Sequence, residues 1–220
     1  MKPKFFILAG PNGAGKSSYG RLRVPLSIPI FDGDLVFAEL QQQYPHIEAE
    51  RLSGGVAVAL EKARDTALSE KAGFAFETNF SNDMAIDITR MFKEAGFETI
   101  LLYFGLDDLE TSASRVDTRV QLGGHEVPLD TIRFNMEEGI IRVTNNLADF
   151  DSVYFLDTGS GQSNYIAFCT KEGANYALLD NNIKWFNKNF KEPLQNLHKA
   201  NLQSLASGQD ENINPGPGRS

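Results

Sequence analysis

Short apolar runs recur along the chain, and each ends at a glycine or a polar residue. A run of roughly four to eight apolar residues between such boundaries is typical of a buried strand in a parallel sheet. The pattern predicts strands at residues 4–9, 28–32, 74–76, 98–105 and 153–156, and two more within 165–179 that meet at a turn over 171–173.

Between these runs, apolar residues recur at the spacing of one helix face. Ser81, Asn82 and Asp83 carry the side-chain oxygens that favour a helix start, and Gly96 closes the same segment. The pattern predicts helices at residues 16–22, 35–43, 47–71, from the cap at 81–83 to 94, and at 109–121, 128–146 and 182–205.

The predicted strands and helices alternate from residue 4 to residue 156. Such alternation favours an α/β fold, in which a mostly parallel sheet has helices on both faces. The end of the chain is rich in glycine, proline and asparagine, which predicts a disordered C-terminal tail over residues 206–220. We therefore expect a single domain over residues 1–205.

Residues Gly10–Ser17 match the phosphate-binding pattern G-x-x-x-x-G-K-[ST], and they lie between an apolar strand and a helix, as this motif requires. The glycines let backbone amides approach phosphate oxygens, and successive N–H groups at a helix start form an anion hole. Lys16 is expected to reach the β- and γ-phosphates, and Ser17 to coordinate Mg²⁺. The motif predicts a P-loop NTPase fold that binds ATP or GTP through Gly10, Pro11, Asn12, Gly13, Ala14, Gly15, Lys16, Ser17 and Ser18.

Acidic side chains follow two of the predicted strands. Asp32 and Asp34 come after the second strand, and Glu77 comes at the end of the third. The carboxyl ends of parallel strands border the ligand crevice of an open α/β sheet, where a carboxylate can accept the proton of an acceptor hydroxyl. Two other interpretations stay open, since Asp34 can cap the next helix and Glu77 can be a solvated strand end.

Cations that face the transferred phosphoryl group are a further part that a kinase needs. Arg115 and Arg119 lie four residues apart and share one face of a predicted helix, and Arg133 lies on the next helix. The alternative is a solvated helix face, on which Arg119 pairs with a nearby acid such as Asp117 or Glu110.

Composition narrows the choice of partners. The chain has 21 basic and 29 acidic residues and a net charge of −8, which disfavours nucleic acid. Its one cysteine, Cys169, excludes an intrachain disulfide, and three scattered histidines do not form a zinc ligand set. The apolar run 5–9 is too short for a signal peptide, and no stretch approaches the roughly 20 apolar residues of a membrane span. We therefore expect a cytoplasmic protein without nucleic-acid or membrane partners.

The loop sequence is also typical of ABC-type ATPases, and Leu52-Ser53-Gly54-Gly55 imitates the signature of those proteins. This segment follows the loop too closely to leave room for their extra subdomains. The strand that comes after it also lacks their Asp-Glu pair. The simpler interpretation is that Gly54 and Gly55 are two glycines in a helix.

Four segments together resemble the zeta-toxin family of P-loop kinases, including its shorter members often described as predicted ABC-type ATPases. In chain order they are Gly10–Ser17, Asp32-Gly33-Asp34, Phe76–Ser81, and the arginine helix at Arg115 that runs into Gly123-Gly124-His125-Glu126-Val127-Pro128. The resemblance covers about residues 4–160, and the last segment is its most distinctive part.

The resemblance implies an ATP- and Mg²⁺-dependent kinase that phosphorylates a hydroxyl of a small molecule, such as a UDP-amino sugar or another nucleotide. It implies that Asp34 is the catalytic carboxylate, and that Lys16 and Arg115 hold the ATP phosphates with help from Arg119. Acceptor-binding roles are then expected for Asp32, Glu77, Asn79, His125 and Arg133. The resemblance also makes an antitoxin protein a candidate partner.

Three positions depart from the family pattern. Asn79-Phe80 stands where many short relatives have Thr-Leu, Val56 where many have arginine, and His125 near a phosphate-binding arginine of the well-known toxins. These changes fall in the acceptor pocket and the lid, and the phosphate loop is intact. We predict an ATP-dependent phosphotransferase, and keep as alternatives a nucleotide-dependent binding module and a simple ATPase with water as acceptor.

Overall fold

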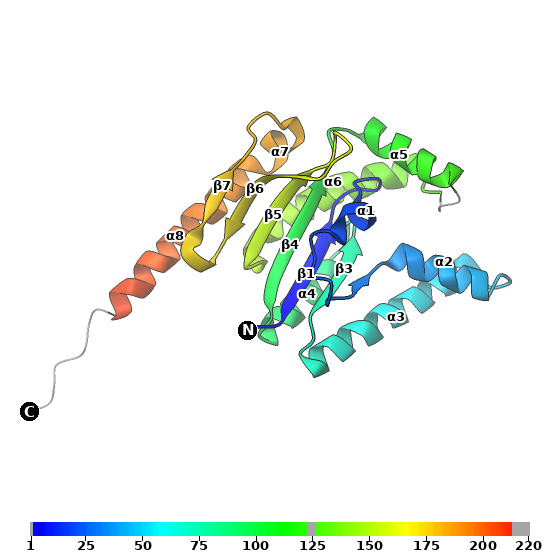
Figure 1. Cartoon of the computed structure of the whole chain (residues 1–220), viewed down its shortest axis with the longest axis horizontal. Coiled ribbons are helices and arrows are strands. Elements are labelled where there is room, and N and C mark those ends of the chain that lie inside the picture. The colour runs from blue at the N-terminus through cyan, green and yellow to red at the C-terminus, as the bar shows by residue number, and fades with distance from the viewer. Residues whose placement is uncertain (1, 123–125, 213–220) are drawn as a thin grey trace, which may run out of the picture.

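The structure is a computed structural model that describes residues 2–122 and 126–212. Within these residues, seven strands form one sheet in the order β2-β3-β1-β4-β5-β6-β7 (Figure 1). The first five strands in that order run parallel to one another, β6 is antiparallel to β5, and β7 is antiparallel to β6. The bounds are β1 Lys4–Ala9, β2 Ile30–Phe31, β3 Phe74–Thr78, β4 Glu98–Gly105, β5 Ser152–Asp157, β6 Asn164–Thr170 and β7 Tyr176–Leu178. The predicted α/β fold with a mostly parallel sheet is confirmed.

The helices largely follow the predicted ranges. They are α1 Lys16–Gly20, α2 Gly33–Gln43, α3 Ala49–Glu70, α4 Met84–Glu94, α5 Leu109–Gln121, α6 Leu129–Asn146, α7 Lys184–Asn189 and α8 Lys191–Asn212, with short 3-10 turns at Leu147–Asp149 and Glu172–Ala174.

The C-terminal region differs from the prediction in two ways. The single helix predicted over 182–205 is wrong, because α7 and α8 are separated at Phe190, where φ is −125° and ψ is −18°. Pro193 has no N–H and its ring obstructs the preceding turn, so a continuous helix through this point is disfavoured. α8 continues to Asn212, seven residues into the segment 206–220 that is predicted to be a disordered tail. Residues 213–220 lie outside the described part of the chain.

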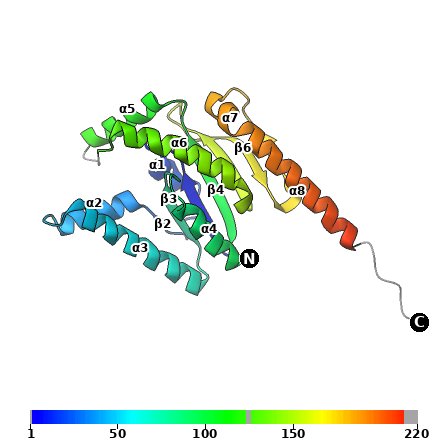
Figure 2. The same cartoon turned by 180° about the vertical axis from the view of Figure 1, so that it is seen from behind.

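Helices cover the two faces of the sheet unequally. One face, with Phe5, Phe76 and Phe155, packs against α3, α4, α6, α7 and α8 (Figure 2). The other face, with Leu8 and Leu102, packs mainly against α1 and the segment that follows it. The prediction of helices on both faces therefore holds, and the short α1 is the helix that lies on the second face in Figure 1.

The sheet brings two loops together at its carboxyl edge. Strands β1 and β3 pair in register, with Leu8 opposite Glu77 and Ala9 opposite Thr78, so the segments that follow these strands leave the sheet side by side. The pair α2 and α3 lies on the β2 side of this edge, and α5 and α6 lie on the other side (Figure 1). Among residues 2–122 and 126–212, no helix is long and apolar enough to cross a membrane.

Candidate active site

The phosphate loop is packed so closely that two of its glycines are required. Gly10 has φ +144°, and a Cβ there would lie 2.1 Å from the carbonyl oxygen of Phe104 on β4. Gly13 has φ +72°, and a Cβ there would lie 2.8 Å from the carbonyl oxygen of Ser112 on α5. Both φ values also disfavour residues with side chains. The loop is therefore held between the sheet and α5, the helix that carries Arg115 and Arg119 and that we call the lid helix. The loop has the conformation that the motif predicts.

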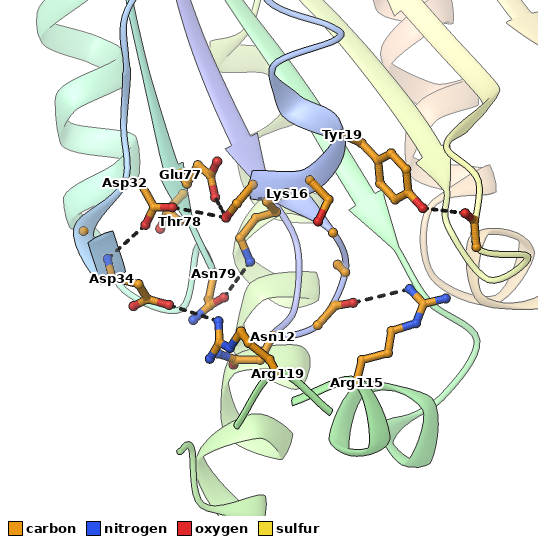
Figure 3. Close-up of a pocket in the computed structure, with 17 residues that line it drawn as sticks. Asn12, Lys16, Tyr19, Asp32, Asp34, Glu77, Thr78, Asn79, Arg115 and Arg119 are labelled. Carbon is orange, nitrogen blue, oxygen red and sulfur yellow. Dashed lines mark hydrogen bonds and ion pairs between the residues drawn. The ribbon is translucent and has the colours of Figure 1, made fainter. Parts of the chain in front are cut away.

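Lys16 starts α1, and its ammonium group is bound by three oxygens. Nζ donates to the carbonyl of Gly10 at 2.8 Å and to that of Pro11 at 3.0 Å. It also donates to Oδ1 of Asn79 at 2.9 Å, the contact drawn in Figure 3. Burial lowers the pKa of Lys16 to about 8, and the nearby carboxylates, Glu77 first, oppose part of that shift. The three oxygens that bind this ammonium are uncharged, so an arriving phosphate would supply a negative charge in direct contact with it.

Ser17 lies between two carboxylates. Its hydroxyl lies 2.7 Å from Oε2 of Glu77 and 3.2 Å from Oδ2 of Asp32, and its one proton can be donated to either carboxylate. Burial raises the pKa of Glu77 to about 7, the hydrogen bond from Ser17 lowers it, and the charge of Asp32 raises it further. The predicted acceptor-binding residues Asp32 and Glu77 thus lie at the hydroxyl of the phosphate loop.

Asp32, rather than Asp34, is the cap of α2. Its Oδ1 accepts hydrogen bonds from the backbone N–H groups of Asp34, at 3.0 Å, and Leu35, at 3.2 Å. Asp34 is the acidic residue of the first helical turn, and its side chain is 69% exposed. The open interpretation of Asp34 as a helix cap is therefore wrong, and its carboxylate is available to the pocket.

Arg119 reaches across the site from α5. Its Nη1 lies 3.4 Å from Oδ2 of Asp34 (Figure 3). The alternative was that Arg119 only pairs with an acid of its own helix, such as Asp117 or Glu110. The ion pair with Asp34 on α2 shows that Arg119 reaches beyond its own helix. The pair brings an arginine and the predicted catalytic carboxylate to one side of the pocket.

Arg115, one helical turn earlier, points elsewhere. Its guanidinium donates to the carbonyl oxygens of Gly13 at 3.3 Å, Thr158 at 2.6 Å and Gly159 at 3.2 Å. It therefore ties the phosphate loop to the segment after β5. Figure 3 shows the contact of Arg115 with the loop. Of the two arginines of α5, therefore, Arg119 lies beside the carboxylate of Asp34, and Arg115 does not.

These side chains line a cavity of about 430 Å³ at the carboxyl edge of the sheet. Its walls are Asn12, Gly13, Ala14, Gly15, Lys16, Ser17, Ser18, Tyr19, Asp32, Gly33, Asp34, Glu77, Thr78, Asn79, Arg115, Arg119 and Gly161. Most of the predicted phosphate-site residues thus meet in one place. Gly10 and Pro11 contribute the carbonyls that accept from Lys16.

Asn79, Arg133 and His125 are also predicted to bind the acceptor. Asn79 lies in the cavity, but its side chain accepts from Lys16, so it belongs to the phosphate site. Arg133 is outside the cavity lining, and its Nη1 lies 3.7 Å from Oδ1 of Asp130, one turn back on α6, so its acceptor role stays a prediction. His125 lies outside the described residues.

Several site residues were missed in the sequence. Tyr19 lines the cavity, and its hydroxyl donates to the carbonyl of Gly161 at 2.5 Å. Ser112 Oγ donates to the carbonyl of Asn12 at 2.6 Å, and Nδ2 of Asn135 donates to Oδ1 of Asn12 at 2.9 Å. No motif marks these positions. The only local signal was that Ser112 lies one helical turn before Arg115.

The donor set fits a magnesium ion. Mg²⁺ in phosphate sites is bound by one or two carboxylates together with phosphate oxygens and water. Ser17, Asp32 and Glu77 supply hard oxygen atoms, and each carboxylate lies within hydrogen-bond distance of the Ser17 hydroxyl. Within the described residues no group of three or more His, Cys, Asp or Glu side chains is arranged for a metal. The site suits an ion that arrives with a nucleotide.

No protein-family model matches the chain. An uncharacterized protein of Haemophilus influenzae is 28% identical over 134 residues, which cover 61% of this chain and 93% of that protein.

Two solved structures extend the comparison. A chain of the PezAT chromosomal toxin–antitoxin system of Streptococcus pneumoniae superposes with a TM-score of 0.61 at 18% identity, over 96% of this chain and 87% of the other. The AvrRxo1-ORF1:ORF2 structure with ATP has a TM-score of 0.66 at 15% identity, over 86% of this chain and 63% of the other. This chain thus spans less than two thirds of the AvrRxo1 chain. The likeness confirms the predicted α/β fold with a mostly parallel sheet.

Proposed function

We propose that this protein is an ATP-dependent phosphotransferase that transfers the γ-phosphoryl group of ATP to a hydroxyl of a small molecule. The observation that carries the proposal is that Asp34 and Arg119 lie on the same cavity as Lys16 and Ser17. A phosphate loop alone binds nucleotide. A carboxylate and a second cation at the phosphate end supply the base and the charge neutralisation that transfer needs.

Nucleotide binding rests on the phosphate loop. The backbone amides of the loop and the start of α1 bind the phosphate oxygens, and the Lys16 ammonium lies among them. Ser17, Asp32 and Glu77 would hold Mg²⁺, which neutralises charge on the phosphates when it is bound. Arg115 keeps the loop joined to the segment after β5 through Gly13 and Thr158.

Transfer would proceed at Asp34. Its carboxylate accepts the proton of the acceptor hydroxyl as that oxygen forms a bond to the γ-phosphorus. The bond between the γ-phosphorus and the bridging oxygen to the β-phosphate breaks, and ADP leaves with that electron pair. Lys16 and Arg119 offset the negative charge that develops on the transferring group and the leaving oxygen. In this assignment Arg119 takes the role that the family resemblance gave to Arg115.

A UDP-amino sugar or another nucleotide is the acceptor class that we propose. This choice rests on the resemblance to the zeta-toxin family and on the shared fold. Asp34 lines the cavity and its side chain is 69% exposed, so a hydroxyl of a bulky acceptor can reach its carboxylate.

The experiment that tests the proposal is phosphoryl transfer from γ-labelled ATP with Mg²⁺. The acceptors are UDP-sugars, nucleosides, NAD and a cell metabolite extract, with Asp34→Asn as the matched inactive variant. A labelled small molecule that disappears with Asp34→Asn is the expected result. Label released only as free phosphate would identify an ATPase instead. Stoichiometric ATP binding without any turnover would identify a nucleotide-dependent binding module.

An antitoxin-type protein partner and a cytoplasmic location complete the proposal. The partner is supported by the fold shared with a chain of the PezAT toxin–antitoxin system. Affinity purification of the full chain from its native cell, with the soluble cytoplasmic fraction assayed separately, tests both. A stable small partner encoded beside this protein is the expected outcome, and recovery of the protein alone would contradict it.

A further inference from the structure

Helix α6 contacts both loops that hold the ammonium of Lys16, although α6 itself does not line the cavity. Lys16 is bound by carbonyls of the phosphate loop and by the side chain of Asn79 in the loop after β3. On α6, Nδ2 of Asn135 donates to Oδ1 of Asn12 at 2.9 Å. One turn later, Gly139 is so close to the second loop that a Cβ there would lie 2.5 Å from the carbonyl oxygen of Asn79.

We propose that Asn135 and Gly139 are positioning residues, which act through Asn12 and Asn79 to place Lys16 at the β- and γ-phosphates. They lie four residues apart and so share one face of α6. The inference rests on the proposed nucleotide site and goes beyond it. It assigns a function to a helix that neither the phosphate-loop motif nor the family resemblance singles out.

Asn12 is the first point of contact. It is 8% exposed and is held twice, through its carbonyl by Ser112 Oγ at 2.6 Å and through its side chain by Asn135. In a planar trans peptide the C=O and the following N–H point in opposite directions. Because Ser112 holds the carbonyl of Asn12 toward α5, the N–H of Gly13 points away from α5. Asn135 holds the side chain of Asn12 as well. With its carbonyl and its side chain both held, Asn12 keeps the N–H of Gly13 in one orientation.

Asn79 is the second point of contact, and it has little freedom to retreat. The next residue, Phe80, has φ +59° and is fully buried, and its N–H donates to Oγ1 of Thr78 at 3.0 Å. A bulky residue at such a φ is strained, and the packing around it must hold it there. The turn 78–80 is therefore held in place by the buried side chain of Phe80, and Gly139 of α6 packs against the carbonyl of Asn79. A methyl group at position 139 would displace Asn79 and draw its Oδ1 away from Lys16.

Four single variants test the assignment. Gly139→Ala and Asn135→Ala alter the two contacts. Gly54→Ala, on α3 where a Cβ meets no atom within 4 Å, and Asn145→Ala, an exposed residue of α6, are the matched controls. The affinities for ATP and for AMP are measured on each full chain by titration calorimetry, and weak AMP binding by competition against a fluorescent ATP analogue.

AMP lacks the two phosphates that Lys16 reaches, so the ratio of ATP to AMP affinity reports the position of that lysine. We expect Gly139→Ala and Asn135→Ala to lower this ratio by about tenfold, the scale of one weakened charge-assisted hydrogen bond. Both controls should keep the wild-type ratio. A general loss of stability would weaken ATP and AMP alike, so a constant ratio in both test variants overturns the assignment.

A double-mutant cycle tests Asn135→Ala further, because this substitution removes atoms and adds none. Asn12→Ala and Asn135→Ala should together lower the ratio no more than the larger single change, because they break one shared hydrogen bond. Additive losses would mean that Asn135 acts elsewhere, and would overturn its assignment. A wild-type chain that binds no ATP would instead overturn the proposed nucleotide site, and the inference about α6 with it.

Discussion

Nη1 of Arg119 lies 3.4 Å from Oδ2 of Asp34, and this ion pair joins the lid helix α5 to the first turn of α2. The two side chains are 41% and 69% exposed, so the pair contributes no more than about 1 kcal/mol to folding. A contact of this strength is readily exchanged for a phosphate. We expect the γ-phosphate of ATP to draw Arg119 away from Asp34, which leaves the carboxylate to the acceptor hydroxyl.

The two lid arginines should behave differently when each is removed. Arg119→Ala is expected to lower the transfer rate by about 10³-fold, the lower end for an arginine at a transferring phosphoryl group, with little change in the melting temperature. Arg115→Ala should instead destabilise the fold by about 1–3 kcal/mol, because three carbonyls lose their charged donor. Steady-state kinetics and thermal unfolding of both variants check this. Equal kinetic losses with unchanged stability would contradict the division of roles.

Neighbouring aspartates should also separate. Asp34→Asn is expected to lower the transfer rate by about 10²–10⁴-fold while the ATP dissociation constant stays within about twofold, because it removes only the base. Asp32→Ala should cost about 1 kcal/mol of folding free energy, because it removes the cap of α2. Chemical denaturation and ATP titration of the two variants provide the measurement. An Asp34→Asn protein that retains full activity would show that another group is the base.

The hydroxyl of Ser17 should make ATP binding depend on Mg²⁺. In the wild type, ATP affinity is expected to rise when Mg²⁺ is added. Ser17→Ala should lose most of that rise, because the remaining oxygens of Asp32 and Glu77 no longer have the hydroxyl between them. Ser53→Ala, whose hydroxyl only donates to the carbonyl of Ala49 within α3, is the control. Calorimetric titrations with and without Mg²⁺ measure the effect, and an undiminished response in Ser17→Ala would rule out this site.

Glu77 should make the stability of the nucleotide-free protein depend on pH. Its pKa is raised from 4.5 to about 7, mainly by burial, so the folded state binds more protons than the unfolded state between those values. The contribution of Glu77 to stability is complete below pH 4.5 and is lost as the pH rises through 7. Glu77→Gln stays neutral throughout and keeps an acceptor for Ser17.

The variant should therefore match the wild type near pH 4.5 and be the more stable protein at pH 8, by up to about 3 kcal/mol. Urea denaturation of both proteins without Mg²⁺ across this range tests the prediction. A stability difference that does not change with pH would show that Glu77 ionises normally.

Some elements were predictable because their causes are local. The phosphate loop was identified from one segment, since its glycines and the Lys-Ser pair have tasks that depend on neighbours in sequence. The strand and helix positions followed from side-chain periodicity. The cap of α2 was local as well. Both aspartates precede the helix predicted from residue 35, but α2 begins at Gly33, so Asp32 caps it and Asp34 lies in its first turn.

By itself, the sequence determined that this chain has an α/β fold with a phosphate loop at the end of its first strand. Only the tertiary structure decided which side chains meet there. Arg119 reaches Asp34 across 85 residues, Lys16 meets Asn79 across 63, and Asn135 meets Asn12 across 123. Such contacts depend on the strand order and on how α5 and α6 pack over the sheet, and no pattern within one segment encodes them. Arg115 and Arg119 are alike in the sequence, and the packing of one helix turn gives them different partners.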